Sequence, residues 1–175
     1  MRVTTVLEQA PPFTAPAVRG AGERVEASLA ALRGRWVLLL FYPRDFTRVC
    51  PTEVIELSKR MPELRAQGAE ALALSVDDAE THARWIAEVL GPVALPLVAD
   101  PDGAIARAYG AFLPGPAVAT RATFIVDPDG VVQYAAFHNL QVGRSISELL
   151  RVLEALRTGD RSPADWQPGQ PTLGR

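Results

Sequence analysis

A run of seven apolar residues, from Trp36 to Tyr42, restricts the fold of this chain more than any other feature. The run is far shorter than the ~20 residues that cross a bilayer. A short continuous apolar run of this kind is typical of a fully buried strand. Pro43 closes it, and proline is not expected inside a central strand. We therefore expect a buried strand at the centre of a sheet.

The segments after this strand alternate between helical and strand patterns. A helix is predicted from residue 51 to about residue 67, with Gly68 as its stop. Its apolar residues recur at steps of three or four: Val54, Leu57, Met61 and Leu64. Further along, the patterns predict a strand over residues 71–76, a helix over 80–90, a short strand over 95–99 and a helix over about 103–109.

A β-hairpin is the clearest local signal in the chain. Apolar runs at residues 122–126 and 131–137 flank Asp127-Pro-Asp-Gly130, in which proline presets φ and glycine tolerates positive φ. Ser145 is predicted to cap a last helix with one apolar face. These steps indicate an α/β domain of thioredoxin-like type, with a central mixed sheet flanked by helices.

Pro-rich segments lie at both ends of the chain. The first 20 residues are expected to be an extended lead-in, and the tail after Gly159 is expected to be irregular. We predict one domain over residues 1–160 and an irregular tail over 161–175, as suits a chain of 175 residues. The net charge of −2 gives no basic surface for nucleic acid and no attraction to an anionic membrane. No signal peptide is apparent, and a single free thiol suits the cytoplasm.

Cys50 is the only cysteine, so an internal disulfide is impossible. Pro51 favours a helix start here, since its missing N–H falls where donors are unpaired. Two placements stay open: Thr47 is the N-cap, or Cys50 is itself the cap with Glu53 three residues on. Both leave the sulfur in the first turn, where the helix dipole stabilises a thiolate. We therefore predict a nucleophile rather than a buried structural cysteine.

The helix dipole supplies only part of the stabilisation that a thiolate needs near neutral pH, so a cation must supply the rest. Arg121, just before the first strand of the hairpin, is the candidate. Arg44 and Arg48 are nearer in sequence, but we expect them to be solvated. Arg144 is a candidate partner for a carboxylate near the site or in a neighbouring subunit.

Other polar residues are weaker candidates. His82 and His138 lie far apart and have no ligand at metal-binding spacing, so we expect structural or surface histidines and no metal. The position of His138, just after the hairpin, is compatible with a subunit contact. Asp77-Asp78 is expected to be a solvated turn at a strand end.

The segment Phe41–Glu53, which reads FYPRDFTRVCPTE, resembles the signature of the peroxiredoxins, the thiol peroxidases, in their alkyl hydroperoxide reductase C and thiol-specific antioxidant branch. The motif is long and specific, and the resemblance extends over most of the chain. It includes Ser75–Asp77, His82–Trp85, Pro96–Asp100, Arg121 with Phe124–Asp127, and Val142–Ser145.

The resemblance implies that the Cys50 thiolate attacks the O–O bond of hydrogen peroxide or an organic hydroperoxide and becomes a sulfenic acid. Pro43 would shield the pocket, Thr47 and Arg121 would bind and polarise the peroxide oxygens, and Glu53 would orient the arginine. A guanidinium and a hydroxyl in a dry pocket suit this chemistry, because negative charge develops on the departing oxygen. No metal, flavin or haem is implied.

The chain departs from the two-cysteine members at the resolving cysteine, which in those proteins precedes a Pro-Ala-x-Trp stretch. Here Ser162 precedes Pro163–Trp166, and serine cannot form a disulfide. Two interpretations stay open: a natural one-cysteine enzyme, or a Cys→Ser change in a two-cysteine enzyme. Either way an outside thiol, a thioredoxin-like protein or a small thiol, must regenerate Cys50. Residues 88–91 read EVLG rather than Gly-Gly-Leu-Gly, which resembles the robust bacterial type.

The strand over residues 131–137 is expected at the edge of the sheet, and an apolar edge needs a partner. This argument and the resemblance predict a homodimer, and the resemblance alone suggests a decameric ring of five dimers. The main rival function is a non-enzymatic scaffold or holdase chaperone on the same fold. A disulfide oxidoreductase is disfavoured, since the chain has no C-x-x-C pair.

Overall fold

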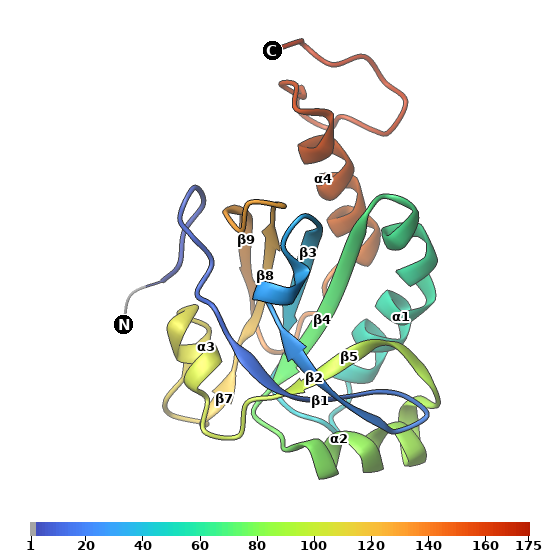
Figure 1. Ribbon diagram of the computed structural model, residues 1–175, viewed down its shortest axis with the longest axis vertical. Coiled ribbons are helices and arrows are strands. Elements are labelled where there is room, and N and C mark those ends of the chain that lie inside the picture. Colours follow the sequence, from blue (N-terminus) through green and yellow to red (C-terminus); the bar gives the residue numbers. More distant parts are fainter. Residues whose placement is uncertain (1–2) are drawn as a thin grey trace. The chain divides into compact units, whose positions relative to one another are not determined.

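The computed structural model describes residues 3–175 and divides them into two compact units, at residues up to 144 and residues 145–175. The first unit contains a seven-stranded sheet with the order β2-β1-β5-β4-β3-β8-β9 (Figure 1). Its strands are β1 (Thr14–Gly20), β2 (Glu23–Ser28), β3 (Trp36–Phe41), β4 (Ala69–Ser75), β5 (Val93–Ala99), β8 (Arg121–Val126) and β9 (Val132–His138). The predicted α/β class with a mixed central sheet is confirmed.

The pairing of the strands is mixed. β3, β4 and β5 are parallel, whereas β1, β2, β8 and β9 join the sheet through antiparallel pairs. β3 lies between β4 and β8, and Leu39 and Leu40 are fully buried, so the prediction of a buried central strand is confirmed. A short separate pair is formed by β6 (Phe112–Leu113) and β7 (Val118–Ala119).

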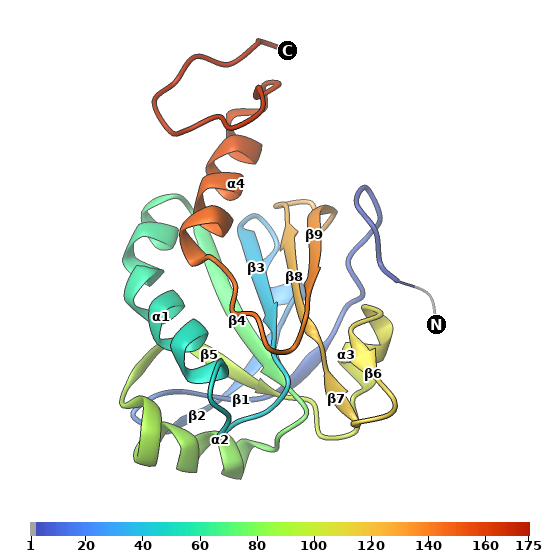
Figure 2. The same cartoon turned by 180° about the vertical axis from the view of Figure 1, so that it is seen from behind.

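Three helices of the first unit flank the sheet: α1 (Cys50–Ala66), α2 (Ala79–Trp85) and α3 (Ala104–Ala108). This unit also has a 3-10 turn η1 (Ala30–Leu32) and a π-helical turn η2 (Ile86–Leu90), whereas α4 (Ile146–Thr158) belongs to the second unit. α1 packs against β4 and β5, and α2 against β1 and β5. Ala106 and Tyr109, at α3, join Leu39 and Phe41 in one core cluster, and alternation along β3 turns Leu40 to the opposite face. α1 and α3 therefore lie on either side of the sheet (Figure 2).

Most elements lie where the sequence predicts them. The helices predicted at residues 51–67 and 103–109 and the hairpin at 122–137 match α1, α3 and β8–β9 within about two residues. The helix predicted at 80–90 is α2 continued by η2. Gly91, with a φ of 69°, ends it.

The expectation for the N-terminal segment is incomplete. Thr14–Gly20 is not merely an extended lead-in but strand β1, which forms a hairpin with β2. Pro16 is tolerated because the register of β1 with β5 begins only at Ala17. Small residues on β1, such as Ala15 and Ala17, give a weak apolar pattern, which is why the strand escapes a periodicity argument.

β9 is an edge strand, as predicted. The N-terminal segment covers only its beginning: the Leu7 amide donates to the Val132 carbonyl at 2.7 Å, and the Val132 amide donates to the Glu8 carbonyl at 2.9 Å. Within residues 3–175, the rest of β9 has β8 as its only strand partner. Phe137 on this strand is 43% exposed.

The second unit begins at Ser145, whose hydroxyl accepts a hydrogen bond from the Glu148 amide and caps α4 as predicted. Gly159, in the left-handed region at a φ of 69°, ends the helix. No helix or strand follows in residues 160–175, and no helix of the described chain is long and apolar enough to cross a membrane. The domain boundary predicted at residue 160 stays a prediction.

Candidate active site

Cys50 is the first residue of α1, and its side chain is fully buried. Val49 occupies the N-cap position without a side-chain hydrogen bond, so both predicted caps are wrong. The Thr47 hydroxyl instead donates to the Arg44 carbonyl at 3.1 Å. The prediction that the sulfur lies in the first turn is nevertheless confirmed. Cys50 is therefore close to the positive end of the helix dipole.

Arg121 makes a hydrogen bond to this sulfur. Its Nη1 donates to Cys50 Sγ at 3.4 Å, and its Nε donates to the Leu140 carbonyl at 2.8 Å. Arg121 begins β8 and is 2% exposed. A rigid strand and a backbone carbonyl thus fix the guanidinium in place.

Glu53 lies one turn along α1 from Cys50 and accepts hydrogen bonds from two arginines. Its Oε2 accepts from Arg121 Nη1 at 2.7 Å and from Arg144 Nη2 at 2.8 Å. Its Oε1 accepts from the Arg144 amide at 2.8 Å and Nε at 2.9 Å. Burial raises the pKa of Glu53, but the hydrogen bonds and charge of Arg144, with the charge of Arg121, outweigh it and hold this pKa below its ordinary value. Glu53 is therefore an ionised, buried carboxylate.

Arg144 connects the site to the centre of the sheet. Its Nη1 donates to the carbonyls of Phe41 and Ala122 at 2.8 and 2.9 Å. These carbonyls belong to the end of β3 and to β8. Arg144 thus meets a carboxylate near the site, one of the two partners considered for it from the sequence.

A surface pocket of about 310 Å³ opens beside this cluster. Arg121 lines it, as do Pro43 and Thr47 from the loop between β3 and α1. Pro43 is buried, whereas Thr47 is exposed. The remaining lining residues are Arg48, Val49, Leu140 and Gln141. Five of the residues singled out from the sequence therefore lie close together: Cys50, Glu53, Arg121, Pro43 and Thr47.

Ser162 lies elsewhere in the chain, in the tail after α4. It lines a hollow with Val152, Ala155 and Leu156 of that helix. Its hydroxyl is buried and has no hydrogen-bond partner among residues 3–175.

A buried polar network supports the loop that carries Pro43 and Thr47, and sequence reasoning missed it. Asp45 accepts from the Tyr42 hydroxyl at 2.8 Å and makes a hydrogen bond to His82 Nδ1 at 2.7 Å. The Asp45 amide donates to Asp77 at 2.8 Å. Both side chains of the Asp45–His82 pair are fully buried. Burial raises the pKa of Asp45.

Two sequence expectations are decided by this network. His82 is a structural histidine of α2, as expected. Asp77 is not a solvated turn residue: it is half-buried and also accepts from the Ser75 hydroxyl at 2.7 Å. Asp78 is exposed and caps α2 by accepting from the Thr81 amide.

Within residues 3–175, no group of three or more potential ligands could hold a metal ion.

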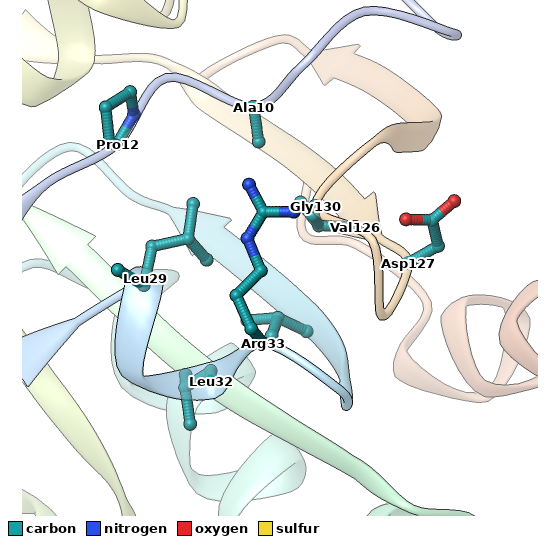
Figure 3. A pocket seen from close by; sticks show the side chains of 10 residues that line it. Ala10, Pro12, Leu29, Leu32, Arg33, Val126, Asp127 and Gly130 are labelled. Carbon is teal, nitrogen blue, oxygen red and sulfur yellow. The ribbon is translucent and has the colours of Figure 1, made fainter.

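A second hollow lies between the N-terminal segment, η1 and the turn of the β8–β9 hairpin (Figure 3). Its space of about 40 Å³ is far below the ~300 Å³ of an ordinary ligand site. Asp127 at its rim accepts hydrogen bonds from the amides of Asp129 and Val131. Arg33 packs so closely over Gly130 that an added Cβ would clash with its guanidinium. This hollow is a structural feature of the turn.

Comparisons with known proteins place these residues in context. Residues 6–135 match the family model described as the AhpC/TSA family. A Clostridium pasteurianum protein, named as a peroxiredoxin of the rubredoxin operon, is 40% identical over 170 residues, which cover 94% of this chain and 96% of that protein. The mitochondrial thioredoxin-dependent peroxide reductase of Bos taurus is 40% identical over 177 residues, covering 96% and 68%.

A solved structure gives the same relation. The reduced 2-Cys peroxiredoxin of Plasmodium vivax superposes with a TM-score of 0.92 at 36% identity, covering 97% of this chain and 92% of that one. The seven-stranded mixed sheet with its flanking helices is therefore a thioredoxin-like fold of the kind predicted.

Proposed function

The chain belongs to the AhpC/TSA family and is a peroxiredoxin, a thiol peroxidase, and on that premise we propose that Cys50 is the residue that reduces the peroxide. The Cys50 thiolate attacks the terminal oxygen of a hydroperoxide. An S–O bond forms, the O–O bond breaks, and the departing alkoxide or hydroxide takes up a proton. The peroxide is reduced to the alcohol or water, and the sulfur is oxidised to a sulfenic acid.

The contact between Arg121 Nη1 and Cys50 Sγ, at 3.4 Å in a buried site, is the observation that carries this proposal. The same guanidinium is positioned to stabilise the negative charge that develops on the departing oxygen. Glu53 orients Arg121 through the 2.7 Å hydrogen bond and balances its charge. Thr47 and Pro43, which line the pocket, bind the peroxide and shield it from water.

The second half of the proposed cycle needs an outside thiol. The chain has one cysteine, and Ser162 stands at the proposed resolving position. A first thiol displaces hydroxide from the sulfenic acid as water and forms a mixed disulfide. A second thiol then attacks this mixed disulfide and releases the Cys50 thiol, and the two reductant sulfurs leave joined in a disulfide. A thioredoxin-like protein or a small thiol is the proposed donor.

We test the assignment of Cys50 with one equivalent of hydrogen peroxide. Intact mass should show the gain of one oxygen atom within seconds, and a dimedone adduct should map to Cys50. The Cys50→Ser variant should gain neither. An unmodified wild-type Cys50 would overturn the proposed mechanism and favour the scaffold or holdase role.

The assembly is also a proposal. β9 is an edge strand with an exposed Phe137, so we propose that it pairs with its symmetry mate in a homodimer. A decameric ring stays a prediction from the family resemblance. Location in the cytoplasm stays a prediction from the single free thiol.

A further inference from the structure

Arg48 is an unneutralised cation at the rim of the pocket. It lines the pocket and is exposed to solvent. Among residues 3–175, no carboxylate, carbonyl or ring engages its guanidinium, and no acidic residue lines the pocket. An exposed guanidinium that no protein group engages is available to a ligand.

The two arginines beneath the pocket differ from Arg48 in this respect. Arg121 and Arg144 both bind the Glu53 carboxylate, and Arg121 also contacts the Cys50 sulfur. With a thiolate at Cys50, two buried negative charges match two buried positive charges. A negative group on a substrate therefore gains nothing from the buried cluster, whereas Arg48 offers it an uncompensated charge.

The pocket walls between these charges are apolar. Pro43, Val49 and Leu140 supply them, while Thr47 and Gln141 are the uncharged polar residues of the lining. Walls of this kind accept the hydrocarbon part of an organic hydroperoxide. Hydrogen peroxide is too small to contact the cluster around Cys50 and the pocket rim together.

We propose that Arg48 makes this site selective for organic hydroperoxides that carry a carboxylate on an apolar body, the chemical class that includes fatty-acid hydroperoxides. The inference rests on the proposed role of Cys50. The hydroperoxide end reaches Cys50 and Arg121, the apolar body lies along Pro43 and Leu140, and the carboxylate binds the Arg48 guanidinium. Arg48 is thus a specificity residue, and the reaction at sulfur is unchanged.

A matched pair of substrates tests this. Cumene hydroperoxide and its para-carboxylate differ by one charged group remote from the O–O bond. Stopped-flow kinetics gives the second-order rate constant of Cys50 oxidation for each, and their ratio is compared between proteins so that the intrinsic reactivity of the two probes cancels. The variants are Arg48→Ala and Arg48→Lys. The control is Arg44→Ala, which removes the same charge from the same loop but outside the pocket lining.

Arg48→Ala should lower the carboxylate-to-neutral ratio about two- to fivefold, the effect expected of one solvent-exposed ion pair. Arg48→Lys should keep most of the ratio, and Arg44→Ala should leave it unchanged. Raising the ionic strength should lower the wild-type ratio and not that of Arg48→Ala, because salt screens exposed charges.

The outcomes separate this inference from the proposed function. An Arg48→Ala ratio equal to that of the wild type, or an equal loss in Arg44→Ala, overturns the role of Arg48 while Cys50 still reacts. If wild-type Cys50 reacts with neither probe nor with hydrogen peroxide, the proposed function itself fails.

Discussion

At the scale of the residue, the site depends on where each buried charge finds its partners. Glu53 is 2% exposed, and an isolated carboxylate there would carry a large desolvation cost. Four hydrogen bonds from Arg121 and Arg144 offset that cost. The cluster thereby keeps Arg121 in a single position beside Cys50.

Replacing Glu53 with glutamine tests this charge balance. Glu53→Gln should lower the free energy of unfolding at pH 7 by about 3 kcal/mol, because it leaves buried arginine charge uncompensated. Urea denaturation measures the loss. Glu148→Gln, at an exposed carboxylate paired with Arg151, is the control and should change the free energy by less than about 1 kcal/mol.

The same pair of proteins gives a pH test. The folded-state pKa of Glu53 is below its ordinary value of 4.5, so its ionised form stabilises the fold above that pH. This contribution disappears as the pH falls through the lower folded-state pKa. The difference in unfolding free energy between the wild type and Glu53→Gln should therefore shrink below about pH 4.5. A difference that is constant from pH 7 to pH 3 would contradict the ionised state of Glu53.

At the scale of the element, the loop between β3 and α1 supplies Pro43 and Thr47 to the pocket beside the Cys50 cluster. The loop contains Phe46 in the left-handed region at a φ of 54°, a strained conformation for a bulky residue. α2 holds it through the Asp45–His82 hydrogen bond and through the ring of Trp85, 6.5 Å from that of Phe46. The Asp45 network thus compensates for the strain of the loop.

Asp45→Ala should destabilise the fold by about 2 to 4 kcal/mol, because the Tyr42 hydroxyl loses its buried acceptor and His82 Nδ1 loses its buried hydrogen-bond partner. The rate of Cys50 oxidation should fall as well, because the loop that carries Pro43 and Thr47 loses its support. Chemical denaturation and dimedone trapping measure the two effects. Asp129→Ala on the exposed hairpin turn should change neither. Wild-type oxidation rates in Asp45→Ala would show that the loop does not need this network.

The free edge of β9 gives a second prediction at this scale. Phe137→Glu replaces an apolar residue that is 43% exposed with a charged one and should convert the proposed dimer into a monomer. Analytical ultracentrifugation measures the change. Val89→Glu, at an equally exposed apolar residue of η2, should leave the dimer intact. A dimer that survives Phe137→Glu would place the interface away from this edge.

At the scale of the whole molecule, the proposed cycle has one thiol of this chain, Cys50, and needs a second thiol from elsewhere. Ser162→Cys should produce a disulfide-linked dimer on a non-reducing gel after one equivalent of peroxide, because the sulfenic acid of Cys50 then meets a resolving thiol of a neighbouring chain. The wild type should stay monomeric on that gel. Ser147→Cys, on α4, is the control and should not cross-link. If Ser162→Cys also stays monomeric, position 162 is not the resolving position.

The local parts of the structure were predictable from the sequence. The apolar run at residues 36–42, the step pattern of α1 and the Asp-Pro-Asp-Gly turn each act over a few residues, so they specify a strand, a helix and a hairpin on their own. The place of Cys50 at a helix start was predicted in the same way, because Pro51 and the preceding apolar run mark it. The predicted N-cap was wrong, because the Thr47 hydroxyl donates to the Arg44 carbonyl instead of capping the helix.

Only the tertiary structure decided which charges are buried together. Glu53 meets Arg121 and Arg144 across 68 and 91 residues of chain, and Asp45 meets His82 across 37. A periodic sequence pattern does not reveal such pairs, because the partner of a buried charge lies on whichever element packs against it. The sequence alone determined the place of Cys50 at the start of a helix and the order of the elements. The packing of β8 and the Arg144 segment on α1, and of α2 on the loop before Cys50, determined the electrostatic surroundings of that thiol.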